Sequence, residues 1–409
     1  MKKNLILTLV LLCSFMHLSV FAAETSLGDS YMNEKENVRL ENFFAKIRRG
    51  QEVNVVALGG SITTGFAAKN PALQGWAGLT GEWIKKLGSQ NGAKVNFYNR
   101  GVSGTDSAFA VARFDDHVQA LKPDLVLLEY AMNDQWLDKS VRQRTYESIV
   151  RRVLASSDCA ILVLFVNERQ APYPSNQAEQ QKICEYYHVP FVSWKDCMEK
   201  AGTLSDFEKY FDGTENVHPN NAGHAKIAEL LEERLERVWK ELPSDNKIAK
   251  PIQKLPAPLT DSVFENVKYY GSANLKPVTN GGWKDGSPVH NEWVSHGKAV
   301  KGWECNVGGT EITFEVEGSC IGVTYCESDQ FRDAQAWVTK EDGSSGPRVN
   351  LNCFSAARKG YYGWAYKKLI DGDKVEKYTV HVIVSKRVAR GGKNKFCNIT
   401  GLLVSSPNP

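Results

Sequence analysis

The chain has 409 residues, of which 42% are hydrophobic and 24% are charged, an ordinary composition for a globular protein of about two domains. Its formal net charge is only +3, and the sequence has no basic run and no basic stripe interleaved with aromatic residues. These features argue against a nucleic acid or an anionic membrane surface as a partner.

The first 23 residues are typical of a signal peptide. Lys2 and Lys3 precede a long apolar run, and Val20 and Ala22 occupy the −3 and −1 positions of a cleavage site. An uncleaved membrane anchor is the alternative, because the run is long enough to span a bilayer. The residues at the boundary favour cleavage, so we expect an exported protein, periplasmic or extracellular, with no membrane association after processing.

Residues 24–242 alternate short apolar runs with amphipathic, helix-like segments. The five runs are VNVVAL, KVNFYN, DLVLLEY, CAILVLFV and VPFVSW, and a long amphipathic helix is predicted at the end of the region. Continuous apolar strands separated by helices indicate a parallel sheet that is covered on both faces. We predict a flavodoxin-like three-layer α/β/α sandwich with its site at the carboxyl ends of the strands.

The pattern changes after this region. Residues 243–262 are rich in proline and are predicted to form a linker. Residues 263–409 contain short β-branched or aromatic runs between turn residues, which predicts an antiparallel β-sandwich or jelly roll. This second domain is also aromatic, which suggests carbohydrate binding, core packing, or a role in shaping the active site. The residues concerned are Trp283, Trp293, Trp303, Trp337, Tyr361, Tyr362 and Trp364.

Eight cysteines remain once the signal peptide is removed. An exported location permits disulfides, but the spacing of the cysteines does not set their connectivity. The sequence has no CxxC pair and no Cys/His cluster with metal-ligand spacing, so we expect no structural zinc.

Polar turns follow the first three predicted strands. GGSITTG places Ser61 after the first strand, where its hydroxyl would lie at the sheet edge near backbone N–H groups. NRGVSGTDS and EYAMND follow the next two strands and supply Gly104 and Asn133, a flexible backbone position and a neutral amide donor. Taken singly, each motif has a structural alternative, a helix cap or a tight turn.

A late segment, DGTENVHPNNAGH, precedes the long final helix of the region. His218 is the candidate base for the serine, and Glu215, three residues earlier, could turn back to orient its imidazole. A structural histidine at a helix start is the alternative for an isolated motif. Here the histidine joins three polar turns that are expected at one edge of one sheet.

Taken in order, GGSIT, NRGVSG, EYAMND and VHP resemble the SGNH (GDSL-like) hydrolase superfamily over roughly residues 50–240. The resemblance implies that Ser61 is the nucleophile and His218 the general base. It also implies an oxyanion hole formed by the backbone N–H groups of Ser61 and Gly104 and by the side chain of Asn133. The family usually has aspartate three residues before the histidine, whereas this chain has Glu215. Asp212 or a backbone carbonyl are the alternatives for orienting His218.

The resemblance implies acyl transfer in two steps, with no metal and no organic cofactor. Exported enzymes of this type with a β-sandwich domain resemble carbohydrate esterases, so the expected reaction is deacetylation of an acetylated polysaccharide or oligosaccharide. A lipid esterase, lysophospholipase or thioesterase is the alternative within enzymes, although the loops lack a long apolar stretch for an acyl chain. A non-catalytic glycan-binding protein on a hydrolase scaffold is the alternative outside enzymes.

Three further residues are candidates for substrate contact. Trp76 and Trp136 lie close in sequence to Ser61 and Asn133 and could stack on a sugar ring, with core packing as the alternative. Arg113 follows the loop of Gly104 and could contact substrate, although a salt bridge to Asp115 or Asp116 is the favoured interpretation.

Overall fold

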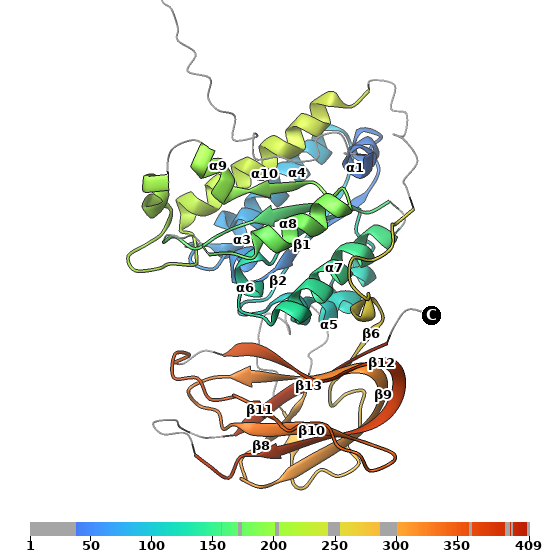
Figure 1. The fold of residues 1–409 in the computed structure, drawn as a ribbon. Coiled ribbons are helices and arrows are strands. Elements are labelled where there is room, and N and C mark those ends of the chain that lie inside the picture. Colours follow the sequence, from blue (N-terminus) through green and yellow to red (C-terminus); the bar gives the residue numbers. More distant parts are fainter. Residues whose placement is uncertain are drawn as a thin grey trace, which may run out of the picture.

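The structure is a computed structural model with a mixed α/β domain and an antiparallel β domain (Figure 1). It describes residues 38–156, 158–170, 174–200, 204–243, 254–286, 301–359, 362–388, 393 and 396–406. The expected signal peptide lies outside these residues. No helix in the described ranges is long and apolar enough to cross a membrane.

The first domain contains a parallel five-stranded sheet in the order β2-β1-β3-β4-β5. This order confirms the predicted flavodoxin-like arrangement. Each of the five apolar runs forms one strand: β1 (Val53–Gly59), β2 (Val95–Gly101), β3 (Leu125–Glu129), β4 (Ala160–Phe165) and β5 (Phe191–Ser193).

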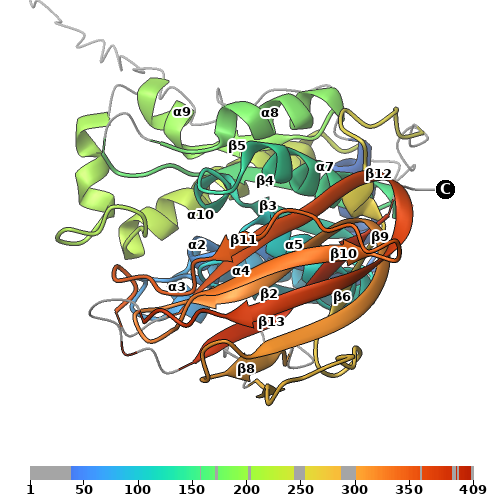
Figure 2. The same ribbon diagram turned by 60° about the horizontal axis from the view of Figure 1, so that its bottom comes forward.

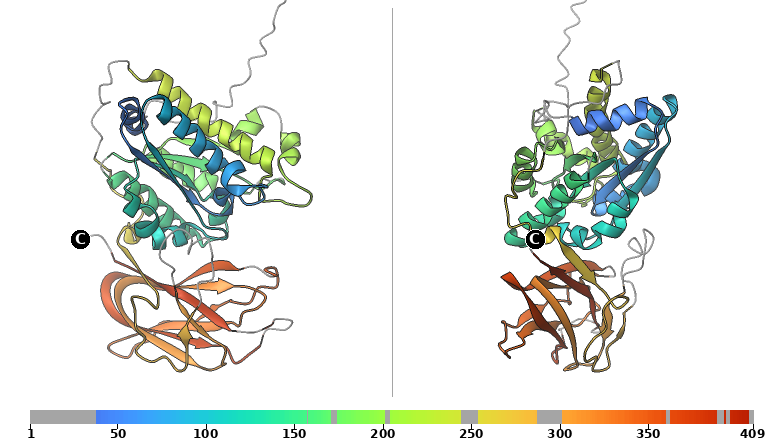
Figure 3. Two further views of the ribbon diagram at one scale, coloured as in Figure 1. Left: turned by 180° about the vertical axis from the view of Figure 1, so that it is seen from behind. Right: turned by 90° about the vertical axis from the view of Figure 1, so that its right-hand side faces the viewer.

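Helices cover both faces of this sheet (Figures 1 and 3). One apolar core contains Val55 and Ala57 and lies under α1 (Val38–Arg48), α4 (Trp76–Gln90), α9 (Trp194–Lys200) and α10 (Asn221–Glu241). The other contains Val56 and Leu58 and lies under α5 (Ser107–His117), α7 (Lys139–Ala155) and α8 (Gln177–Tyr186). Because side chains alternate along a strand, one apolar run supplies both cores.

Several short elements connect the strands and helices. They are α2 (Ser61–Thr64), α3 (Pro71–Gln74), α6 (Ala131–Asp134) and the 3-10 turns η2 (Gln119–Leu121), η3 (Leu204–Tyr210) and η4 (Val263–Glu265).

The second domain is built on an eight-stranded sheet, which confirms the predicted antiparallel β domain (Figure 2). Its main path is β11-β10-β12-β9-β13-β8-β7, with β6 paired to β13. The last strand in sequence, β13, therefore lies inside the sheet and pairs with β9, β8 and β6. The strands are β6 (Val267–Tyr270), β7 (Lys284–Asp285), β8 (Trp303–Cys305), β9 (Glu311–Glu327), β10 (Ala334–Lys340), β11 (Val349–Leu351), β12 (Gly363–Val384) and β13 (Cys397–Ser405).

The eight cysteines outside the expected signal peptide are all buried. Cys353 and Cys397 come close, with their Sγ atoms 3.8 Å apart in the core of the second domain. Burial raises the pKa of the Cys353 thiol well above its usual value, which favours the protonated thiol.

The second domain packs against α5 and α7 of the first (Figures 1 and 3). Val267, Tyr366 and Leu403 belong to the same apolar cluster as the inner residues of these two helices. The rings of Phe109 and Trp364 also meet across the boundary, with centroids 3.8 Å apart. The interface is therefore continuous with the core of the α/β domain.

A polar contact reinforces this interface, and it carries a prediction. The Arg144 guanidinium on α7 binds Asp261 at 2.7 Å and Asp371 of β12 at 2.8 Å, and its side chain is 10% exposed. We expect Arg144→Ala to lower the free energy of unfolding by about 1–3 kcal/mol, because two partly exposed carboxylates lose their shared partner. Urea unfolding would measure the loss. Lys368→Ala is the control, because Lys368 is a more exposed second partner of Asp371. Equal effects of the two variants would contradict this prediction.

Candidate active site

The nucleophile turn joins β1 directly to the short helix α2, and Ser61 is the first residue of that helix. A side chain would clash at Gly59 and would be tight at Gly60. A Cβ on Gly59 would lie 2.0 Å from Thr63 Oγ1, and one on Gly60 would lie 3.1 Å from Asn133 Nδ2. Gly59 therefore lets the turn pack closely on Thr63, and Gly60 lets it approach the Asn133 side chain.

His218 lies in the turn before α10, and its Nε2 atom is 2.8 Å from Ser61 Oγ. The Phe66 ring packs on the imidazole with a centroid separation of 4.5 Å. Burial lowers the pKa of His218 below its usual 6.5, while the nearby Glu215 carboxylate acts in the opposite direction. At neutral pH the imidazole is therefore largely unprotonated, which is the form a general base requires.

Glu215 is the acid closest to His218 in the described structure. Its Oε1 atom is 3.3 Å from His218 Nδ1, although the two are not aligned as in a good hydrogen bond. The same oxygen accepts the backbone N–H groups of residues 216, 217 and 218 at 2.8–3.1 Å. Burial acts to raise the pKa of Glu215, but these N–H groups and His218 outweigh it, so the net pKa is lowered and the carboxylate stays charged. Asp212 instead accepts a hydrogen bond from Asn220 Nδ2 at 2.9 Å.

The predicted oxyanion residues meet at the same sheet edge. Gly104 has φ +70° in the loop after β2, a conformation that favours glycine. Asn133 lies in α6 after β3, and its Nδ2 donates to the Thr105 carbonyl at 2.7 Å. This bond fixes the amide between the loop of Gly104 and the turn of Ser61. Because the amide carries two N–H donors, one remains for an oxyanion.

Asp134 supports this arrangement, although it was not among the residues predicted from the sequence motifs. The carboxyl is buried and accepts the Ser107 backbone N–H at 2.8 Å and Gln180 Nε2 at 2.9 Å. It thereby fastens the start of α5, and with it the end of the loop that contains Gly104, to the helix of Asn133. The one sequence signal that could have indicated this role is an acidic residue directly after Asn133, in the turn that follows an apolar strand.

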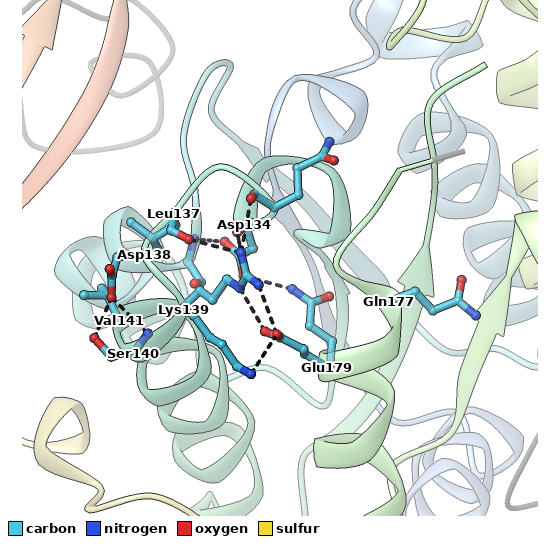
Figure 4. Close-up of polar contacts among 12 residues, drawn as sticks. Asp134, Leu137, Asp138, Lys139, Ser140, Val141, Gln177 and Glu179 are labelled. Carbon is cyan, nitrogen blue, oxygen red and sulfur yellow. Dashed lines mark hydrogen bonds and ion pairs between the residues drawn. The ribbon is translucent and has the colours of Figure 1, made fainter. Parts of the chain in front are cut away.

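Trp136 lies three residues after Asn133 and is 80% exposed. Its backbone is held in place by Arg142, which binds the carbonyls of residues 134, 135 and 137 and forms two hydrogen bonds with Glu179, at 2.8 and 3.0 Å. Figure 4 shows Asp134, Leu137 and Glu179 around these contacts. Trp136 is thus an exposed indole on a rigid turn at the edge of the site.

Two other candidates for substrate contact are buried instead. Trp76 is 0% exposed and packs in the core, because it is the first residue of α4 and the apolar face of this helix turns toward the sheet. Arg113 is 1% exposed and binds the carbonyls of Arg100 and Gly59. The favoured salt bridge of Arg113 is also not seen, since Asp115 pairs with Arg152. Neither side chain can reach a bound substrate in this conformation.

The second domain reaches the loop of Gly104. A Cβ on Gly104 would lie 3.8 Å from the Tyr362 carbonyl oxygen and from the Gly363 Cα. Beside this contact, Arg358 Nε binds Glu327 at 3.1 Å. The second domain therefore borders the oxyanion loop. Most of its aromatic candidates are buried: Trp283, Trp303 and Trp337 within the second domain, and Trp364 against Phe109 of the first domain. Tyr362 stacks on Phe331. Trp293 and Tyr361 lie outside the described residues.

The site combines a serine on a strand-to-helix turn, an imidazole within hydrogen-bond distance and a neighbouring amide donor, which are the groups that serine hydrolysis requires. Residues 57–226 match the model of the GDSL-like Lipase/Acylhydrolase family. The α/β domain is therefore similar to this family over these residues, and the match supports an ester-hydrolysing enzyme.

Solved structures extend the likeness to both domains. A two-domain esterase (CEX) active on acetylated mannans is 24% identical, with a TM-score of 0.80 over 94% of this chain and 99% of that chain. The same esterase co-crystallised with mannopentaose has a TM-score of 0.77 over 91% and 96% of the two chains. At this identity the likeness shows a shared two-domain fold. A comparison with curated protein sequences found no match.

Proposed function

We propose that this protein is an exported serine esterase that removes O-acetyl groups from a polysaccharide or oligosaccharide. The observation that carries the proposal is the 2.8 Å contact between Ser61 Oγ and His218 Nε2 beside the side chain of Asn133. The two-domain fold shared with an esterase active on acetylated mannans supports a glycan as the substrate.

In the proposed mechanism His218 takes the Ser61 proton as the hydroxyl attacks the acetyl carbonyl. The oxyanion accepts hydrogen bonds from the backbone N–H groups of Ser61 and Gly104 and from the Asn133 amide. His218 then protonates the sugar oxygen as its bond to the acetyl carbon breaks, so that the sugar leaves as an alcohol and the acetyl group stays on Ser61. Water attacks the acetyl-enzyme with His218 again as base, and acetate leaves. Glu215 is proposed to orient the imidazole and to stabilise its charged form.

Two features support a sugar as the leaving group. Trp136 offers a large exposed ring on a fixed turn beside Asn133, an arrangement suited to stacking on a sugar. The contact of the second domain with the loop of Gly104 supports a role for that domain in shaping the site.

The acyl and glycan preferences test this proposal. We expect 4-nitrophenyl acetate to be cleaved far faster than the octanoyl ester, and acetate to be released from an acetylated glycan. A panel of acetylated mannan, xylan and pectin would be assayed. Mannan comes first, because the two-domain esterase with the same fold is active on acetylated mannans. A rate that rises with acyl length would instead favour the lipid esterase, and exposed Phe66 and Leu73 would then become candidates for acyl contact.

Trp136 carries a separate prediction. We expect Trp136→Ala to lower kcat/KM on the acetylated glycan about 10-fold while changing it less than about twofold on 4-nitrophenyl acetate, because only the glycan extends to the indole. Trp136→Phe should retain most of the glycan activity, since it keeps an aromatic face. Equal losses on both substrates would show that Trp136 supports the fold of the site and does not bind sugar.

A further inference from the structure

The peptide bond between Gly59 and Gly60 precedes the nucleophile, and its carbonyl end is held by three donors. The Gly59 oxygen accepts hydrogen bonds from Arg113 Nη2 at 3.2 Å, Tyr130 Oη at 3.2 Å and the Val102 N–H at 3.0 Å. Arg113 and Tyr130 are both buried, and Arg113 Nη2 also donates to Tyr130 Oη at 2.7 Å. A buried cation and a buried phenol thus share one carbonyl oxygen.

A buried carboxyl faces the other end of the same peptide. Glu129, the last residue of β3, is 1% exposed, and its Oε2 accepts a hydrogen bond from Thr63 Oγ1 at 3.2 Å. The N–H groups of Gly60 and Met132 interact with this carboxyl and favour its charged form, although Oε1 has no well-aligned partner. Burial is the larger influence and raises the pKa of Glu129 to about 7.

The placement of Glu129 relates it to both sides of the oxyanion hole. Gly60 directly precedes Ser61, whose N–H is one proposed donor, and Met132 directly precedes Asn133, whose side chain is another. The backbone N–H of the residue before each donor therefore interacts electrostatically with one carboxyl, which Thr63 also binds. Burying a carboxyl costs stability, and an apolar residue would fill the same space at less cost. A reason to retain such a group is a geometry that apolar packing does not impose.

We propose that Glu129 is a positioning residue that fixes the spacing between the Ser61 N–H and the Asn133 side chain, with Arg113 and Tyr130 holding the opposite end of the Gly59–Gly60 peptide. This inference rests on the proposed oxyanion hole. Its consequence is specific: loss of Glu129 should weaken binding of the transition state and leave binding of the ground-state ester nearly unchanged, because the donors act on charge that develops during attack.

The test measures kcat and KM on 4-nitrophenyl acetate, with active sites counted by saturation labelling with a fluorophosphonate. We expect Glu129→Ala to lower kcat per labelled site 10- to 100-fold with KM within about twofold of wild type. Glu129→Gln should recover to within about threefold, because its amide oxygen can accept from the backbone while Thr63 accepts from its NH₂. Tyr130→Phe should lower kcat about threefold by removing one donor to Gly59.

The control is Glu147→Gln, a second buried glutamate that binds the N–H groups of Leu259 and Thr260 far from the site. We expect it to lower Tm but to keep the wild-type kcat per labelled site. The proposal is overturned if Glu129→Ala keeps wild-type kcat, raises KM instead, or is not rescued by Glu129→Gln. If Glu129→Ala gives no labelled enzyme, wild-type kcat in Tyr130→Phe would overturn it. Failure of the wild type to cleave the ester would instead overturn the proposed function.

Discussion

Ser61→Ala is expected to lower ester hydrolysis by about 10⁴-fold or more while the protein remains folded. The side chain is small and 7% exposed, so its removal leaves almost no cavity. The 2.8 Å contact with His218 makes Ser61 Oγ the nucleophile that the imidazole can deprotonate. Turnover of 4-nitrophenyl acetate, release of acetate from an acetylated glycan and Tm would be measured on the same preparation.

Ser89→Ala is the matched control, because Ser89 lies exposed near the end of α4. This variant should keep wild-type activity. Near-wild-type turnover by Ser61→Ala would eliminate Ser61 as the nucleophile and remove the basis of the proposed mechanism. Loss of turnover together with loss of the folded state would require the covalent adduct on Ser61 to be identified by mass spectrometry before the role is assigned.

Glu215→Gln is expected to lower kcat by roughly 10³-fold, because the imidazolium formed during attack loses its carboxylate partner. Gln keeps the oxygen that accepts the turn N–H groups, so the loop should stay in place. The sign of the pH effect is also determined. The carboxylate raises the pKa of His218, so its removal should lower that pKa further and move the rising limb of kcat/KM to lower pH. A pH–rate profile of both enzymes would show this shift.

Asp212→Asn provides the comparison, because Asp212 binds Asn220 at the surface. We expect this substitution to change kcat by less than about twofold. The opposite ranking of the two variants would transfer the orienting role to Asp212. Two mild effects would support a serine–histidine dyad with a backbone carbonyl as the orienting group.

The layered α/β architecture follows from the sequence because the central strands β1, β3 and β4 are almost wholly apolar. Val55 and Val56 are adjacent, yet they enter different cores, and only a sheet covered on both faces buries both. Parallel strands also bring their carboxyl ends to one edge, which is why three short motifs far apart in sequence could be expected around Ser61. The antiparallel second domain was predictable as a class, but its pairing of β13 with β9 and β8 depends on long-range contacts that local pattern does not encode.

The substrate candidates show where sequence reasoning ends. Trp76 and Trp136 both lie near site motifs, but one faces the core and the other faces solvent, which depends on the rotation of each segment about its axis. Arg113 binds backbone carbonyl oxygens. Because every residue has a carbonyl, the sequence pattern does not indicate which ones Arg113 will bind. The sequence does show Glu129 as an acidic residue at the end of an apolar strand. A glutamate at such a position is usually exposed to solvent, so the sequence does not predict that it is buried.

The interior position of β13 has a consequence for synthesis of the protein. The α/β domain can begin to form when its last helix is complete, but the second sheet lacks an internal strand until residue 405 has been made. Until then the apolar faces of α5 and α7 that it covers remain open to solvent. Loss of the last ten described residues, 397–406, would remove the whole of the strand that joins β9 to β8. A chain stopped there would expose unpaired strand edges, which is the usual route to aggregation or proteolysis.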